Sequence, residues 1–149
     1  MKPDPFPSLM FPSCAECAGI GYRYVPALLW DLEDDCGADV MKAFALQYGG
    51  TAIKVGDAYA IPDFRAPDLD PLSAARGWLF QTKGRGDLVI PLGPASRSAR
   101  VAWTAFHMLN AGASLAQVAE RTAVDLRTVC NIKNKLRLVG ALPKKGSTP

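Results

Sequence analysis

Apolar and small side chains recur between Leu115 and Ile132 at a spacing that few folds can accommodate. Counted from Leu115 as the first, the fourth, fifth, tenth, fifteenth and eighteenth residues are Val118, Ala119, Val124, Val129 and Ile132. Two short helices that cross closely need a small residue early in the first helix, and apolar residues at such offsets fill the wedge between them. The spacing therefore predicts a helix-turn-helix. The ninth position, where glycine is usual, holds Ala123.

Three helices are expected in this part of the chain, with bounds near 98–110, 115–121 and 125–136 or 125–138. Ser114 precedes the second helix, and its side chain can cap that helix in a capping box with Gln117. The helical pattern breaks at residues 122–124, after which Asp125 is a good N-cap for the third helix. The pattern thus predicts a tri-helical unit that starts shortly after Pro94.

Charge is unevenly distributed along the 149 residues. Residues 94–149 hold nine Lys and Arg but two acidic residues, a net charge of +7, whereas residues 1–93 hold eight basic and twelve acidic residues, a net charge of −4. A basic end on an acidic body suggests a polyanionic partner for one end only. We therefore expect double-stranded DNA as the partner of the tri-helical unit, with a protein-docking unit as the alternative.

The outward surface of the third helix is the expected base-reading surface, because Val129 and Ile132 face the core. Arginine can fork onto guanine and asparagine can pair with adenine. The expected base contacts are Arg127, Thr128, Asn131 and Asn134. The expected phosphate contacts, on helix starts, flanks and the tail, are Arg97, Arg100, Ser114, Gln117, Lys133, Lys135, Arg137, Lys144 and Lys145.

The first 93 residues predict a different organisation. Residues 1–24 are rich in Pro, Ser, Cys and Gly without periodicity, which indicates an extended arm. Beyond them the expected helices are 26–32, 38–47 and 72–80, the expected strands are 51–55 and 88–90, and a turn is expected at 83–86. The order helix, glycine turn, strand thus occurs twice, which suggests two related αβ units. The predicted fold class is mostly α with a small β element.

Several stretches carry a family resemblance. They are 32–35, 44–53, 88–91 and 110–119, which read LEDD, FALQYGGTAI, LVIP and NAGASLAQVA. From Val25 to Arg137 the chain resembles the Mor/C family of phage transcription activators, named for the middle-operon regulator of phage Mu. The resemblance implies that residues 25–93 form a dimerisation region and residues 94–149 the DNA-binding domain. It also implies that the strand residues Thr51, Ile53 and Lys54 lie near the dyad of the bound DNA.

The function expected from these features is sequence-specific DNA binding in transcription regulation, in a phage or mobile element. The resemblance implies an activator that binds a dyad-symmetric promoter as a homodimer and recruits RNA polymerase. The alternative is a non-enzymatic accessory or inhibitor protein of DNA transactions, such as a recombination factor, a repressor or a DNA-mimic inhibitor. We find no catalytic arrangement around the single histidine, His107, and expect neither an enzyme nor a cofactor.

Two cysteines and the N-terminus complete the sequence-based expectations. Cys14 and Cys17 have the spacing of half a zinc site, but a structural site needs four ligands. An inert or redox-sensitive pair is therefore expected ahead of a metal site. The apolar runs are shorter than the ~20 residues that cross a bilayer, and prolines interrupt the N-terminus. A cytoplasmic protein is expected.

Overall fold

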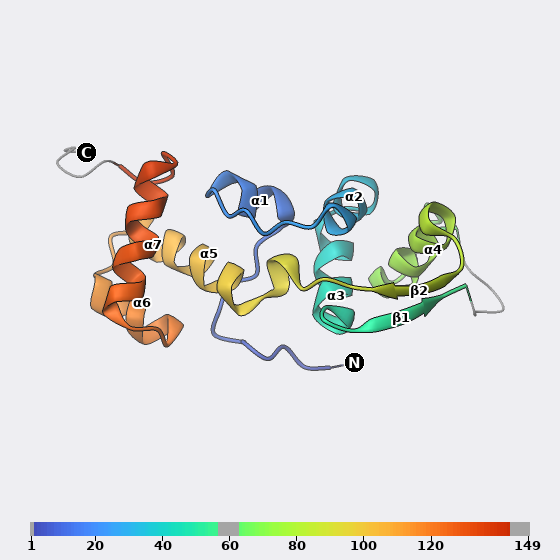
Figure 1. The fold of residues 1–149 in the computed structure, drawn as a ribbon, viewed down its shortest axis with the longest axis horizontal. Helices are drawn as coiled ribbons and strands as arrows, with labels where there is room; N and C mark the ends of the chain where they lie inside the picture. Colours follow the sequence, from blue (N-terminus) through green and yellow to red (C-terminus); the bar gives the residue numbers. More distant parts are fainter. Residues whose placement is uncertain (1, 57–62, 144–149) are drawn as a thin grey trace.

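The computed structural model describes residues 2–56 and 63–143, which are mostly helical with one small sheet, as the sequence predicts (Figure 1). The elements in this part of the chain are, in order, α1 (Cys14–Gly19), α2 (Ala27–Cys36), α3 (Ala38–Tyr48), β1 (Ala52–Val55), α4 (Pro71–Lys83), β2 (Gly86–Val89), the 3-10 turn η1 (Gly93–Ala95), α5 (Arg97–Asn110), α6 (Leu115–Thr122) and α7 (Leu126–Leu138). The body built from α2, α3, α4 and the sheet lies at one end of an elongated molecule, and α6 and α7 lie at the other.

The body contains the two αβ units that the repeat predicts. α3 is followed by a glycine turn and β1, and α4 is followed by a glycine and β2. The two helices pack on each other, and the two strands pair antiparallel with Ala52 opposite Val89 and Val55 opposite Gly86. Gly50 has φ of +80° in the first turn, a conformation that favours glycine. The two units therefore share one sheet and one core.

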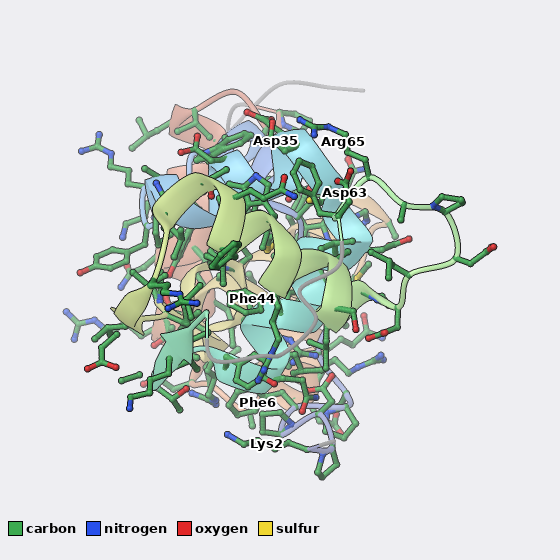
Figure 2. The ribbon with its side chains drawn as sticks, turned by 90° about the vertical axis from the view of Figure 1, so that its right-hand side faces the viewer. Lys2, Phe6, Asp35, Phe44, Asp63 and Arg65 are labelled. Atoms are coloured by element: carbon green, nitrogen blue, oxygen red, sulfur yellow. The ribbon has the colours of Figure 1, made fainter. Side chains whose placement is uncertain are left out.

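The core of the body comes from side chains far apart in the sequence. Phe44 of α3 and Leu29 of α2 are fully buried, and Trp78 of α4 is 1% exposed. The Trp78 indole Nε1 donates to Oδ2 of Asp35 at 2.7 Å, so the ring is held from α2. Figure 2, which faces this end of the molecule, places Phe44 in the middle of the body and Asp35 at its upper margin.

Residues 1–24 are not an extended arm throughout, because residues 14–19 form α1. Ser13 and Glu16 make a capping box, with Ser13 Oγ accepting from the Glu16 amide at 3.0 Å. Both carboxylate oxygens of Glu33 accept from the first amides of the helix, those of Cys14 and Ala15. This second cap comes from α2, so no local pattern in residues 1–24 could indicate it.

α2 and α4 are both longer than predicted. The helix predicted to end at residue 32 continues to Cys36, so it includes Glu33 and Asp35, whose carboxylates accept hydrogen bonds from α1 and α4, respectively. α4 begins at Pro71 with Asp70 as its N-cap and continues through Lys83. Gly86, expected in a turn, opens β2 instead.

The tri-helical unit has the predicted bounds to within about one residue at each helix start, and its three helices pack on one another. Ser114 and Gln117 form the expected capping box, and Asp125 accepts from the Thr128 amide at 2.8 Å. Val118 and Val129 are fully buried together with Ala105 of α5. These residues form the wedge that the spacing predicts.

The segment before α1 runs beside α5 and connects the body to the tri-helical unit (Figure 1). Its start is held on α3, where the Lys2 amide donates to Gln47 Oε1 at 2.7 Å. Its later part is held on α5, where Thr104 Oγ1 accepts from the Met10 amide at 2.9 Å. Lys2 and Phe6 are both seen at the lower margin of the molecule in Figure 2. We call residues 2–12 the N-terminal strap.

Candidate nucleic-acid interface

The outer face of α7 carries the predicted base contacts. Helix geometry places successive side chains about 100° apart, so the residues opposite the buried stripe of Val129 and Leu136 can be identified. They are Arg127, Cys130, Asn131 and Asn134, and all four are exposed. Thr128 is also exposed but lies to one side of this face, toward α5. The sequence placed all four predicted base contacts on one surface; Arg127, Asn131 and Asn134 do share it, whereas Thr128 lies at its edge.

Cys130 is a residue of this face that the sequence interpretation missed. It stands three residues after Arg127 and four before Asn134, a helical spacing that could have revealed it. The thiols of Cys14 and Cys17 are buried, and desolvation raises the pKa of both, that of Cys17 to about 12. Burial also raises the pKa of Cys36. Cys130 is therefore the cysteine most open to reagents from solvent.

Arg100 does not belong to the interface, so its prediction as a phosphate contact is wrong. Its side chain is 1% exposed and pairs with the carboxylate of Asp4, whose Oδ2 accepts from Nη2 at 2.8 Å. The backbone carbonyls of Phe6 and Leu9 accept from the same nitrogen at 2.8 and 2.7 Å. The basic pattern of α5 indicated an exposed charge. In the structure the N-terminal strap covers the guanidinium group of Arg100 and accepts its hydrogen bonds.

Arg97, at the first turn of α5, is exposed and remains a candidate phosphate contact. Its Nη2 donates to the carbonyls of Thr122 and Ala123 at 3.2 Å each, which ties α5 to the end of α6. Arg121, which was not among the predicted contacts, is exposed as well and donates from Nε to the Ser8 carbonyl at 2.8 Å.

The N-terminus of α6 offers polar groups from an exposed capping box. Ser114 Oγ accepts from the Gln117 amide, and Gln117 Oε1 accepts from the Ser114 amide at 2.9 Å. The hydroxyl hydrogen of Ser114 and the side-chain NH₂ of Gln117 can then donate to a phosphate. Their role as phosphate contacts stays a prediction.

Cations flank the outer face of α7 on both sides. Lys133 and Arg137 lie on one flank and are partly buried, whereas Lys135 lies on the other flank and is exposed. Lys144 and Lys145, also predicted as phosphate contacts, lie outside the described residues. The cationic flanks and the polar outer face together make a surface suited to a groove lined by phosphates.

The strand residues expected near a dyad lie at the opposite end of the molecule from α7 (Figure 1). Lys54 is exposed and pairs in register with Asp87, while Ile53 packs against the core of the body. The Thr51 hydroxyl donates to the Tyr48 carbonyl at 2.7 Å. One chain therefore does not bring these residues together with the α7 surface.

Cys14 and Cys17 are buried in α1. In residues 2–56 and 63–143, no group of three or more His, Cys, Asp or Glu side chains is arranged to hold a metal ion. Within the same ranges, no helix combines the length and apolarity needed to cross a membrane.

Comparisons of the chain with protein-family models, with curated proteins and with solved structures found no match. The resemblance to the Mor/C family therefore stays a hypothesis, and the functional conclusion depends on the residues of the interface.

Proposed function

We propose that the protein is a sequence-specific DNA-binding transcription regulator in which α6, the turn and α7 act as a helix-turn-helix. The observation that carries the proposal is the polar, exposed outer face of α7 with Arg127, Asn131 and Asn134. An α-helix fits the major groove of B-DNA, and these side-chain types match the hydrogen-bonding groups on guanine and adenine edges. The buried side chains of Val118 and Val129 belong to one cluster and pack α6 against α7.

The net charge of the tri-helical unit supports the same proposal even when the buried Arg100 is not counted. The exposed or partly buried cations of the described tri-helical unit are Arg97, Arg121, Arg127, Lys133, Lys135 and Arg137. Two acidic residues, Glu120 and Asp125, oppose these six cations, which leaves a surface charge of +4. Phosphate contacts of this kind position a protein on the duplex and make its binding depend on salt.

The decisive experiment selects duplexes from a random pool with the full chain and compares binding of the best duplex with that of a random one. Arg127→Ala should weaken the specific complex by ~1–3 kcal/mol and leave random-duplex binding nearly unchanged, because one bidentate base contact is lost. Arg85→Ala, an exposed arginine at the far end of the body, is the matched control and should change neither. An equal loss on both duplexes would contradict the assignment of α7 as the recognition helix.

Cys130 offers a contact test that does not depend on a substitution. Alkylation by iodoacetamide, followed by mass spectrometry, should be slowed at Cys130 by the selected duplex, because the thiol lies between Arg127 and Asn134 on the outer face. Cys36, half-buried on α2, is the internal control and should react at an unchanged rate. If saturating duplex does not slow the alkylation of Cys130, the DNA does not bind at the outer face of α7.

We further propose that the protein binds a dyad-symmetric promoter as a homodimer through the body and activates transcription by recruiting RNA polymerase. This part comes from the family resemblance alone. Light scattering should give twice the 16.0 kDa of one chain. A run-off transcription assay on the selected duplex then separates activation from a repressor or accessory role.

A further inference from the structure

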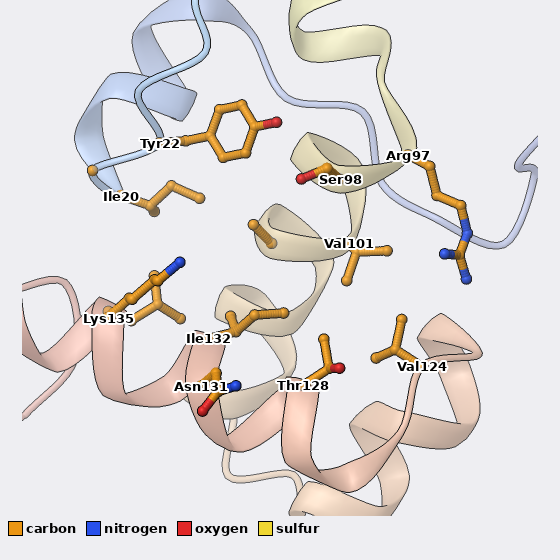
Figure 3. A pocket seen from close by; sticks show the side chains of 13 residues that line it. Ile20, Tyr22, Arg97, Ser98, Val101, Val124, Thr128, Asn131, Ile132 and Lys135 are labelled. Carbon is orange, nitrogen blue, oxygen red and sulfur yellow. The ribbon is translucent and has the colours of Figure 1, made fainter.

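A cavity of about 620 Å³ opens beside α7, between α5 and the residues that follow α1 (Figure 3). Ile20 to Tyr22 form one wall, the first turns of α5 form the second, and α7 with Val124 forms the third. Cavities of roughly 300–1,000 Å³ are typical of sites that hold small organic ligands. Of the base contacts proposed above, Asn131 lines this space and Arg127 and Asn134 do not, so DNA binding by the outer face of α7 does not account for the cavity itself.

The wall chemistry restricts what can occupy the cavity. Its apolar part comes from all three walls and consists of Ile20, Val101, Ala102, Val124, Ile132 and Leu136. Hydroxyl and amide groups of Tyr22, Ser98, Thr128 and Asn131 add hydrogen-bonding partners. The residues that line it in the described part of the chain include Arg97 and Lys135 but no Asp or Glu. Apolar walls with a positive charge favour a ligand with an apolar body and one negative group.

Lys135 is the better placed of the two cations. Arg97 already uses Nη2 on the carbonyls of Thr122 and Ala123, on the far side of the cavity. Figure 3 shows the Lys135 side chain rising from α7 toward Ile20, across the mouth of the cavity from Arg97. A carboxylate could pair with this ammonium while the body of the ligand lies against Ile132 and Val101.

We infer that this cavity binds a small aromatic or branched carboxylic acid, which pairs with Lys135 and lowers the affinity of α7 for DNA. The second part rests on the proposed function. Thr128, Asn131 and Lys135 both line the cavity and were predicted to touch DNA, so an anion held there removes a positive charge from the interface. The ligand also bridges α7 to residues 20–22 and thereby constrains the helix from the side of the body.

The binding test uses 1-naphthaleneacetate as the probe and its neutral amide, 1-naphthaleneacetamide, as the matched comparison. Calorimetry on the full chain should show one saturable site for the acid and binding about fivefold weaker for the amide, the effect of one partly exposed ion pair. In Lys135→Gln the affinity for the acid should fall to the affinity for the amide. Lys133→Gln, on the opposite flank of the same helix, is the control and should bind like the parent chain.

Substitutions that fill the cavity with a larger side chain test independently whether the ligand binds there. Ala102→Phe should abolish binding, and Ser98→Trp should do the same from an exposed position at the rim, where the larger side chain leaves the core undisturbed. Absence of saturable binding, or binding that both filled variants retain, would overturn the ligand site.

The proposed effect of the ligand on DNA binding is measured separately. The selected duplex should bind several-fold more weakly in saturating 1-naphthaleneacetate, and Ala102→Phe should remove this effect. Unchanged DNA affinity with the probe bound would overturn the coupling and leave the ligand site standing. A chain that binds the probe but no duplex under any condition would contradict the proposed function alone, because calorimetry decides the site without DNA.

Discussion

The tri-helical unit and the body of this molecule close their helix ends with different partners. In the tri-helical unit, Ser114 and Asp125 cap α6 and α7 through amides three residues ahead. In the body, Asp70 also caps α4 through the amide three residues ahead, but Glu33 of α2 caps α1 from 18 and 19 residues away, and Asp35 holds Trp78 across 43 residues. The helix ends of α6 and α7 are therefore capped by near neighbours in the sequence, whereas the body also depends on contacts between remote segments.

The N-terminal strap connects these two regions. It bonds Gln47 of α3 at one end, Arg100 and Thr104 of α5 in its later half, and Arg121 of α6 through the Ser8 carbonyl. The rings of Phe6 and Phe11 lie 5.7 and 5.0 Å from the Arg100 guanidinium carbon. The orientation of the proposed DNA-binding unit relative to the body therefore depends on a segment that precedes both.

The largest expected effect tests whether the two regions unfold together. Phe44→Ala in the body should lower the free energy of unfolding by ~3–5 kcal/mol, and Val129→Ala in the tri-helical unit by about 2 kcal/mol, since each leaves a cavity scaled to the atoms removed. Urea denaturation followed by circular dichroism measures both. Each variant should keep one transition because the strap joins the regions. Two separate transitions in Phe44→Ala would show that the tri-helical unit folds without the body.

A smaller effect is expected from the strap itself. Asp4→Ala should cost about 2 kcal/mol near neutral pH, because the buried Arg100 guanidinium loses its carboxylate but keeps the carbonyls of Phe6, Leu9 and Met10. Chemical denaturation measures the loss. Asp34→Ala, an exposed carboxylate on α2, is the control and should change stability by less than ~0.5 kcal/mol.

The cost of Asp4→Ala should also depend on pH in a defined direction. Hydrogen bonds from Arg100 hold the pKa of the Asp4 carboxyl below its usual range in the folded chain. A carboxyl with a depressed folded pKa stabilises fully above its unfolded pKa of ~3.9 and loses that contribution as pH falls through the folded value. The difference between parent and variant should therefore shrink in acid. A difference that grows in acid would contradict this role of Asp4.

The smallest expected change in stability concerns the turn between α6 and α7, whose conformation is set by local residues. Ala123, in the turn between α6 and α7, has φ of +57°, which strains a residue with a Cβ atom. Ala123→Gly should raise the free energy of unfolding by about 0.5–1 kcal/mol, the relief of strain exceeding the entropy that glycine loses. Thermal denaturation measures the gain. Ala111→Gly, at a helix end with φ of −85°, should not stabilise, and equal effects would refute the role of the turn conformation.

Most of the tri-helical unit could be predicted from the sequence, including its helices, both caps and the exposure of Arg127, Asn131 and Asn134. The repeated αβ order of the body could also be predicted, though not that its two strands pair with each other. α1 was missed although its first cap, the capping box of Ser13 and Glu16, is a local signal, and only its second cap, from Glu33, is remote in the sequence. The cavity beside α7 escaped prediction too, since its three walls come from residues 20–22, α5 and α7.

The sequence by itself determined the helical periods, the caps and the spacing of the wedge, because each depends on residues within about four positions of one another. The tertiary structure alone decided which charges remain on the surface. Arg100 shows the reason most clearly, since its carboxylate partner stands 96 residues earlier in the chain. Burial and pairing over such separations follow from how the strap, the body and α5 pack, and no local pattern encodes them.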